Sequence, residues 1–186
     1  MSTDLAPAPV PLRVTLDAAC LKHLRESLQR GVTVPARVPC TVAAFLVGQL
    51  GVEPAYVEQR ISSMFLDGQV VDDPEAAVIR EGSILALSAA LPGLVGATLR
   101  KGGYYAAMRS DITLAPEDAA GGEPAGSGAI RLKLFNLVLE ELAPAVLGRG
   151  ILLPHDEAVA LLEALGRPVD PPPPGAPALL VAAPPP

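Results

Sequence analysis

The sequence predicts an α+β fold in which an amphipathic helix crosses a mixed sheet, and three stretches support this prediction. Residues 41–51 have the apolar spacing of a helix with one buried face. Asp67-Gly68 separates the apolar runs 64–66 and 70–71. This dipeptide is typical of a tight hairpin because both central positions of the turn need positive φ. Residues 83–89 form a mostly apolar run, which is typical of a buried strand.

The segment before this core is predicted to form a strand, a helix and a second strand. Apolar residues alternate with others over residues 10–16, which indicates the first strand. Asp17 is expected to cap a helix that ends at Gly31. This helix places one stripe of side chains on a common face: Cys20, Leu21, Leu24 and Leu28. Pro35 and Pro39 interrupt the next apolar run, so the second strand is expected to be irregular or to lie at a sheet edge.

Capping signals delimit the elements that lead into the hairpin. Thr41 is expected to cap the crossing helix, which ends at Gly51. Its buried face is predicted to comprise Val42, Phe45, Leu46 and Leu50. Pro54 can open a short helical turn, and residues 61–66 then form the strand that enters the hairpin.

The second half of the chain shows weaker patterns. Residues 97–108 are consistent with a further hairpin, and residues 130–139 are predicted to form a strand. Residues 140–147 contain a proline, so at best a short helix is expected there. Residues 156–165 are predicted to form a last helix, which Gly166 ends.

The order of sequence features around the predicted hairpin resembles that of a known family. Residues 67–71 read Asp-Gly-Gln-Val-Val, a loop containing proline follows, and Glu81-Gly82 precedes the last apolar strand. Over roughly residues 10–97 this resembles the ubiquitin-like β-grasp domain of the molybdopterin-synthase small subunit and thiamine sulfur-carrier type. The resemblance implies a mixed sheet with a crossing helix. Those carriers end in a free Gly-Gly that is adenylated and converted to a thiocarboxylate, whereas this chain continues to Pro186.

The predicted organisation therefore has five parts. They are a flexible leader (1–9), a β-grasp-like domain (10–110), a linker or loop (111–128), a strand-helix extension packed on the first domain (129–168), and a disordered proline-rich tail (169–186).

Composition excludes some classes of partner. The chain has 20 acidic and 14 basic residues and a net charge of −6, which disfavours nucleic-acid binding. Its two cysteines cannot form a disulfide framework, so a reducing cytoplasm is expected. Residues 82–99 are uncharged, but Pro92 and Gly93 interrupt them and no membrane association is expected.

No residue pattern predicts catalysis, a cofactor or a metal. Both cysteines and both histidines of the chain would be needed for a zinc site, and Cys20 is expected to pack in the core instead. Asp67, Asp72 and Asp73 could bind a cation, although carboxylates beside a turn usually cap it. Lys101-Gly102-Gly103 lacks the spacing of a phosphate-binding loop.

An apolar stretch followed by basic and aromatic residues is the candidate interaction patch, since Tyr and Arg are typical interface anchors. Its members are Leu91, Pro92, Gly93, Leu94, Val95, Gly96, Arg100, Lys101, Tyr104, Tyr105 and Arg109. The same stretch could instead be a hairpin that completes the core.

The leading hypothesis is a non-catalytic ubiquitin-like interaction or accessory module with a protein partner. The alternative is a sulfur-carrier or conjugation precursor cut after Gly93, Gly96 or Gly103. A third hypothesis is a small enzyme that uses His155, Asp156 and the cysteines.

Overall fold

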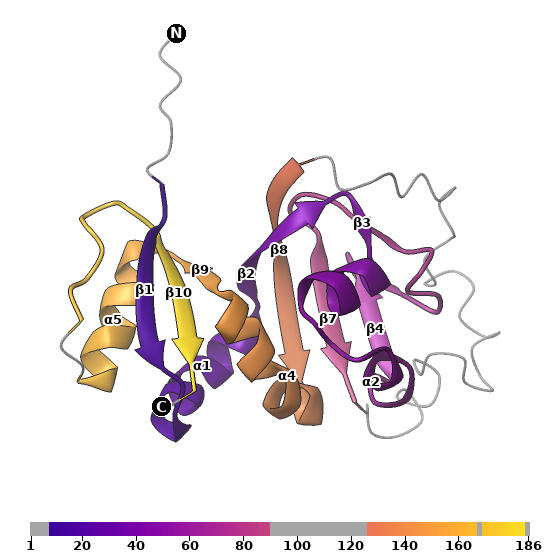
Figure 1. Ribbon diagram of the computed structural model, residues 1–186, viewed down its shortest axis with the longest axis horizontal. Helices are drawn as coiled ribbons and strands as arrows, with labels where there is room; N and C mark the ends of the chain where they lie inside the picture. The colour runs from indigo at the N-terminus through magenta and orange to yellow at the C-terminus, as the bar shows by residue number, and fades with distance from the viewer. Residues whose placement is uncertain (1–7, 90–125, 167–168, 185–186) are drawn as a thin grey trace, which may run out of the picture.

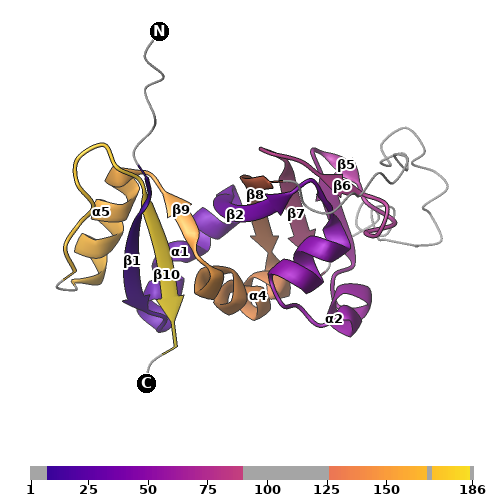
Figure 2. The same ribbon diagram turned by 45° about the horizontal axis from the view of Figure 1, so that its top comes forward.

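The computed structural model describes residues 8–89, 126–166 and 169–184. Within these residues an eight-stranded mixed sheet has the order β1-β10-β9-β2-β8-β7-β4-β5, and β3 and β6 form a separate pair (Figure 1; β5 and β6 are labelled in Figure 2). The strands are β1 (Val10–Thr15), β2 (Val32–Val38), β3 (Cys40–Thr41), β4 (Ser63–Leu66), β5 (Gln69–Val70), β6 (Val78–Ile79), β7 (Ile84–Ser88), β8 (Gly126–Phe135), β9 (Ile151–Leu153) and β10 (Ala178–Ala183). The helices are α1 (Ala18–Arg30), the π-helix η1 (Ala44–Gln49), α2 (Pro54–Gln59), α4 (Asn136–Arg149) and α5 (His155–Leu165). None of these helices is both long and apolar enough to cross a membrane.

The large sheet consists of two groups of strands. β1, β10 and β9 form one group, and β2, β8, β7, β4 and β5 form the other. A single pair, Thr33 with Leu152, joins them. Helix α4 packs on β10 in the first group and on β8 and β7 in the second, as Figure 2 shows between the two groups. Buried side chains from both groups belong to one hydrophobic core.

Helix α1 and the hairpin form as their local signals predict. The side chain of Asp17 accepts a hydrogen bond from the backbone N–H of Cys20 at 2.9 Å, and Gly31 ends the helix with a φ of 112°. In the hairpin, Asp67 and Gly68 have φ values of 51° and 86°, as a tight turn between β4 and β5 requires. β4 pairs with β7 in antiparallel register.

The helix predicted after Thr41 forms, but it is wound more loosely than an α-helix. The hydroxyl of Thr41 accepts a hydrogen bond from the N–H of Ala44 at 3.1 Å, as expected of a capping residue. The N–H of Leu50 bonds to the carbonyl of Phe45, five residues back, which makes the segment a π-helix. Phe45 and Leu46 are fully buried.

The second strand continues through Pro35 and ends before Pro39. Pro35 lies where one side of β2 is an open sheet edge, which is one of the two predicted alternatives. The backbone carbonyl of Ala129 accepts a hydrogen bond from the N–H of Gly82, and the N–H of Arg131 donates one to the carbonyl of Ser83. These two residues of β8 therefore direct their backbone groups toward β7. Pro35 is opposite Ala129 on β2 and therefore directs its backbone away from β8. Since β9 pairs with β2 at one residue only, Pro35 removes no bond from the sheet.

The boundary between β8 and α4 was predicted wrongly. Residues 136–139, expected in a strand, belong to α4, and α4 continues past Pro144 to Arg149. The run from Leu132 to Leu142 is rich in leucine and has no glycine or proline to mark a boundary. Such a run fits a buried strand or a buried helix equally well. Tertiary packing decides between strand and helix, because residues 136–149 are buried as a helix against both groups of strands.

Two strands have partners that the sequence did not indicate. β1 pairs in parallel with β10, with Val10 opposite Ala178, so the first strand lies at the far edge of the sheet from β5. β10 falls in the segment predicted to be a disordered tail, and that prediction is wrong for residues 178–183. Alternate side chains of β10 are buried, with Ala178 and Leu180 at 0% exposure, so the strand has a core to join despite the surrounding prolines.

β8 corrects the predicted organisation of the two halves. It begins at Gly126, within the predicted linker, and lies between β2 and β7. The extension predicted over residues 129–168 therefore does not simply pack on the outside of the first domain. It contributes an internal strand, whose residues Ile130, Leu132 and Leu134 are at most 1% exposed.

Candidate functional site

The predicted interaction patch and cleavage sites lie outside the described residues. This applies to every member of the patch between Leu91 and Arg109 and to Gly93, Gly96 and Gly103. These assignments stay predictions, as does the hairpin expected over residues 97–108.

The cysteines occupy apolar positions on separate elements. Cys20 is fully buried on α1, and Cys40 is buried on β3, where its sulfur accepts a hydrogen bond from Gln49 Nε2 at 3.3 Å. Burial raises the pKa of the Cys40 thiol, and the bond from Gln49 lowers it by less. A raised pKa keeps this sulfur in the protonated, weakly nucleophilic form at neutral pH.

The histidines and the acidic cluster do not form a metal centre in the described part of the chain. No three His, Cys, Asp or Glu side chains gather there closely enough to hold a metal ion. Asp67 accepts hydrogen bonds from Ile84 N–H at 2.6 Å and from Ser83 Oγ at 3.0 Å. Asp73 accepts from the N–H of Glu75. These two carboxylates cap turns, which is the simpler of the two predicted roles.

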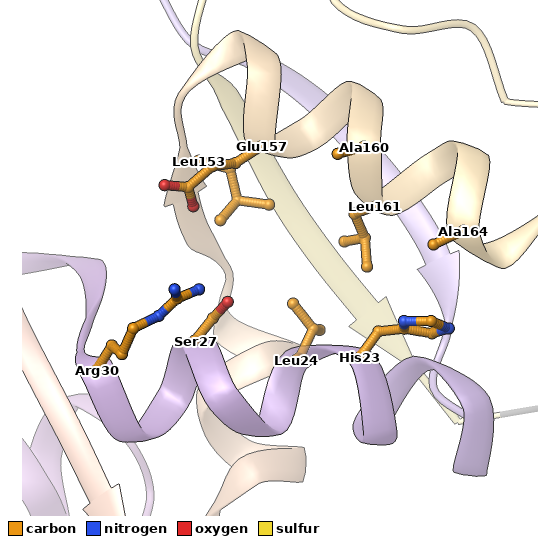
Figure 3. A pocket seen from close by; sticks show the side chains of 9 residues that line it. All are labelled: His23, Leu24, Ser27, Arg30, Leu153, Glu157, Ala160, Leu161 and Ala164. Atoms are coloured by element: carbon orange, nitrogen blue, oxygen red, sulfur yellow. The ribbon is translucent and has the colours of Figure 1, made fainter.

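The structure adds a site that the sequence analysis did not identify, a cleft of about 410 Å³ between α1 and α5 (Figure 3). We call it the α1–α5 cleft. Its lining comprises His23, Leu24, Ser27, Arg30, Leu153, Glu157, Ala160, Leu161 and Ala164. Arg30 and Glu157 lie at one end, His23 and Ala164 lie at the other, and Leu24 and Leu161 face each other between them.

Helical spacing explains why these side chains line one cleft. On α1 the lining positions begin at His23 and continue three or four residues apart, through Ser27 to Arg30. On α5 they begin at Glu157 and end at Ala164 with the same spacing, so each set lies on one face of its helix. Small side chains on α5 leave space between the helices. In the sequence, each helix has a stripe of charged, small and apolar residues at helical spacing. No pattern within either helix indicates that the two stripes face each other.

A smaller cavity of about 250 Å³ adjoins the charged end of the cleft. It shares Ser27, Arg30 and Glu157 with the cleft and adds Gly31 and Arg131. A Cβ atom on Gly31 would lie 2.7 Å from Arg131 Nε and 3.1 Å from Lys133 Cγ. Glycine at this position therefore allows the β8 side chains to lie against the chain that follows Arg30.

Three cations thus gather beside the cleft in a protein of net negative charge. We call Arg30, Arg131 and Lys133 the cationic cluster. Arg30 also pairs with Glu26, one turn earlier on α1, at 3.5 Å. Both of these side chains are about two thirds or more exposed, at 66% and 75%, so that ion pair is weak. Glu157 is the acidic residue that lines both cavities.

The cationic cluster continues onto an exposed face of the sheet. Arg131 is paired with Thr33 on β2 and with Ile84 on β7, so these three side chains share one face. Ile84 is 39% exposed and is one of two large exposed hydrophobic residues among those described; Leu137 is the other. The face therefore combines an apolar residue with arginine, and it borders the cavity that contains Arg131.

Together the fold and this surface define an α+β protein with a large mixed sheet and a polar-rimmed cleft between two helices. Comparison of the chain with models of protein families, with curated proteins and with solved structures finds no match.

Proposed function

We propose that this chain is a non-catalytic protein-interaction module built on a ubiquitin-like β-grasp unit. The observation that carries the proposal is the strand order β2-β8-β7-β4-β5 with β7 and β8 parallel at its centre. The chain passes from β2 through η1 to β4, turns in a hairpin to β5, and returns through β7. A strand, a crossing helix, a hairpin and a returning central strand follow one another as in a β-grasp sheet. In this proposal β8 takes the place of the first strand of the unit.

The chemistry of the described residues supports a non-catalytic role. The cysteines are buried, and Asp67 and Asp73 are engaged in turns. The charged groups that line the α1–α5 cleft are the exposed side chains of Arg30 and Glu157, which are suited to recognition of a partner.

The proposed contact face is the row Thr33, Arg131 and Ile84 together with the cationic cluster. Arginine is enriched at interfaces, and an exposed isoleucine beside it can be buried by a partner. The cluster favours a partner whose contacting surface is acidic.

Photo-crosslinking tests this function. A photoreactive amino acid replaces Ile84 in the full chain, expressed in its cell of origin. We expect one discrete protein adduct after irradiation. The matched control carries the same group at Arg13, which is exposed on β1 at the other end of the sheet, and should not give that adduct. Identical patterns at both positions, or turnover of a substrate by the purified protein, would contradict the proposal.

The carrier alternative stays a prediction, and the sheet sets a condition on it. A cut after Gly93, Gly96 or Gly103 would leave β8 on the second piece, and the first piece would lack the strand between β2 and β7. Release of a folded carrier would therefore require replacement of an internal strand. Intact-mass measurement of protein from its own cell tests this alternative. A truncated species or a thiocarboxylate mass shift would support it, and only full-length protein would argue against it.

A further inference from the structure

We infer that the α1–α5 cleft binds the C-terminal residue of a partner protein, with its carboxylate at Arg30 and Arg131 and an apolar side chain between Leu24 and Leu161. The inference rests on the proposed function as an interaction module and specifies the chemistry of the partner.

The charged end of the cleft fits a carboxylate. Arg30 and Arg131 both line the smaller cavity, and a guanidinium group can bind a carboxylate through two parallel hydrogen bonds. The contact between Arg30 and Glu26 is long and exposed, so it competes weakly with a ligand. Lys133 lies beside Arg131 over Gly31 and adds positive charge to this end.

Glu157 adds a second requirement, because it lies at the same end as Arg30 (Figure 3). A simple anion bound at the arginines would place its negative charge close to the carboxylate of Glu157. Such an anion has no N–H group that could donate a hydrogen bond to Glu157. The last residue of a peptide carries an N–H on the same Cα as its carboxylate. That N–H can donate to Glu157 while the carboxylate binds the arginines. This pairing accounts for both signs of charge at one end of the cleft.

The middle of the cleft fits an apolar side chain. Leu24 and Leu161 face each other there, and Ala160 on α5 occupies little space. The cleft volume of about 410 Å³ is within the range typical of small-ligand sites, roughly 300–1,000 Å³. This volume is large enough for a side chain of leucine size.

Continuity with the proposed contact face favours a protein partner over a free small molecule. Arg131 lines the smaller cavity and also pairs with Ile84 on the exposed face of the sheet. A partner whose chain ends in the cleft would lie directly beside that face, so one protein can contact both.

The probe for this site is N-acetyl-L-leucine, which has a carboxylate, an amide N–H and an apolar side chain. It is titrated into the ¹⁵N-labelled full chain and followed by chemical-shift changes. We expect saturable shifts in α1 and α5 with a dissociation constant in the millimolar range, as a ligand of this size allows. N-acetyl-L-leucinamide, which lacks the charge, should bind at least about tenfold more weakly.

Exposed side chains permit variants that leave the core intact. Arg30→Gln and Glu157→Gln should each weaken binding about tenfold or more. Ala160→Tyr should prevent binding by filling the cleft while keeping every charge. Lys22→Gln on α1 and Glu163→Gln on α5 are matched controls outside the cleft lining and should bind as the native chain does.

Three results would overturn the inference. Equal binding of the acid and the amide would show that no carboxylate is recognised. Tighter binding of free L-leucine than of N-acetyl-L-leucine would assign the cleft to an amino acid. Absence of shifts in α1 and α5 with native protein would show that the cleft does not take this residue. The photo-crosslinking experiment at Ile84 does not depend on this titration. If N-acetyl-L-leucine does not bind, the crosslinking result still tests the proposed interaction function.

Discussion

Gln49 replaces a neighbouring strand along the open edge of β2. Its Oε1 accepts from Arg37 N–H at 2.8 Å, and its Nε2 donates to the Arg37 carbonyl at 2.9 Å. Arg149 from α4 donates to the Pro35 carbonyl at 3.3 Å and to the Gln49 carbonyl at 2.6 Å. Two side chains thus satisfy backbone groups that would otherwise face water or attract another strand.

We expect Gln49→Ala to lower the free energy of unfolding by about 1–3 kcal/mol, because both hydrogen bonds to Arg37 are lost. Urea unfolding followed by circular dichroism measures the change. Gln59→Ala, at the exposed end of α2, is the matched control and should change stability little. Similar losses in both variants would show that Gln49 has no special role at this edge.

A second residue-scale contact joins α2 to α4. The carboxylate of Glu141 accepts from Arg60 Nη2 at 2.6 Å and from Tyr56 Oη at 2.6 Å. These two hydrogen bonds lower the pKa of Glu141 to about 2, and the bond from Arg60 has the larger effect. Burial, followed by the hydrogen bond donated to Glu141, raises the pKa of Tyr56.

This contact predicts a specific pH dependence. Because the carboxyl of Glu141 has a lower pKa in the folded chain than in the unfolded chain, its contribution is complete above about pH 4.5 and is lost as pH falls toward about 2. We therefore expect the stability difference between native protein and Glu141→Gln to be largest near pH 7 and to shrink over that interval. Thermal unfolding at a series of pH values measures it, with Glu58→Gln on the exposed surface of α2 as control. A difference independent of pH would contradict the assignment.

At the scale of elements, β10 joins the N-terminal and C-terminal parts of the fold. It pairs with β1 on one side and β9 on the other, and α4 packs against it. Its apolar residues alternate between buried and half-buried positions, so both faces of the strand are partly covered. Loss of β10 would leave β1 without a neighbouring strand and β9 with only its single pair to β2.

We expect truncation after Asp170 to abolish cooperative unfolding, because β1 and β9 would lose their shared partner. Circular dichroism and thermal unfolding measure this, and truncation after Ala183 is the control that keeps the strand. Leu180→Ala is a milder variant. Leu180 is 0% exposed, so the substitution should cost about 2–5 kcal/mol. Full stability of the chain ending at Asp170 would show that β10 is dispensable.

At the scale of the whole molecule, β8 joins the part of the chain after residue 125 to the strands that come before residue 90. It pairs with β2 from the first part of the chain and with β7, and it leads directly into α4. Buried side chains from residues 8–89, 126–166 and 169–184 belong to one core.

A break in the connection between β7 and β8 should therefore leave the protein assembled. We insert a specific protease recognition sequence between residues 118 and 119 and cleave it after folding. The two pieces should co-elute in size-exclusion chromatography and separate in denaturant, since strand pairing and the shared core hold them together. Separation of the pieces under native conditions would contradict the role assigned to β8.

Local signals predicted a large part of the fold but little of the candidate site. Asp17, Thr41 and Asp67 act as their positions predict, because a cap or a turn depends on residues within a few positions of the chain. The cleft depends on how α1 and α5 meet, and these helices lie far apart in the sequence. The lining residues on α1 and α5 were therefore predicted correctly as parts of helices, but no sequence pattern indicated the space between the two helices.

The sequence by itself determined α1, α5, the helix that follows Thr41, the hairpin and the caps at Asp17 and Thr41, since short-range sterics and apolar spacing specify these features. The tertiary structure alone decided that β8 lies between β2 and β7 and that β10 joins β1 to β9. Each of these strands has apolar residues that several partners could have buried. Only the packing of the whole chain, with α4 against both groups of strands, selects one arrangement and opens the α1–α5 cleft.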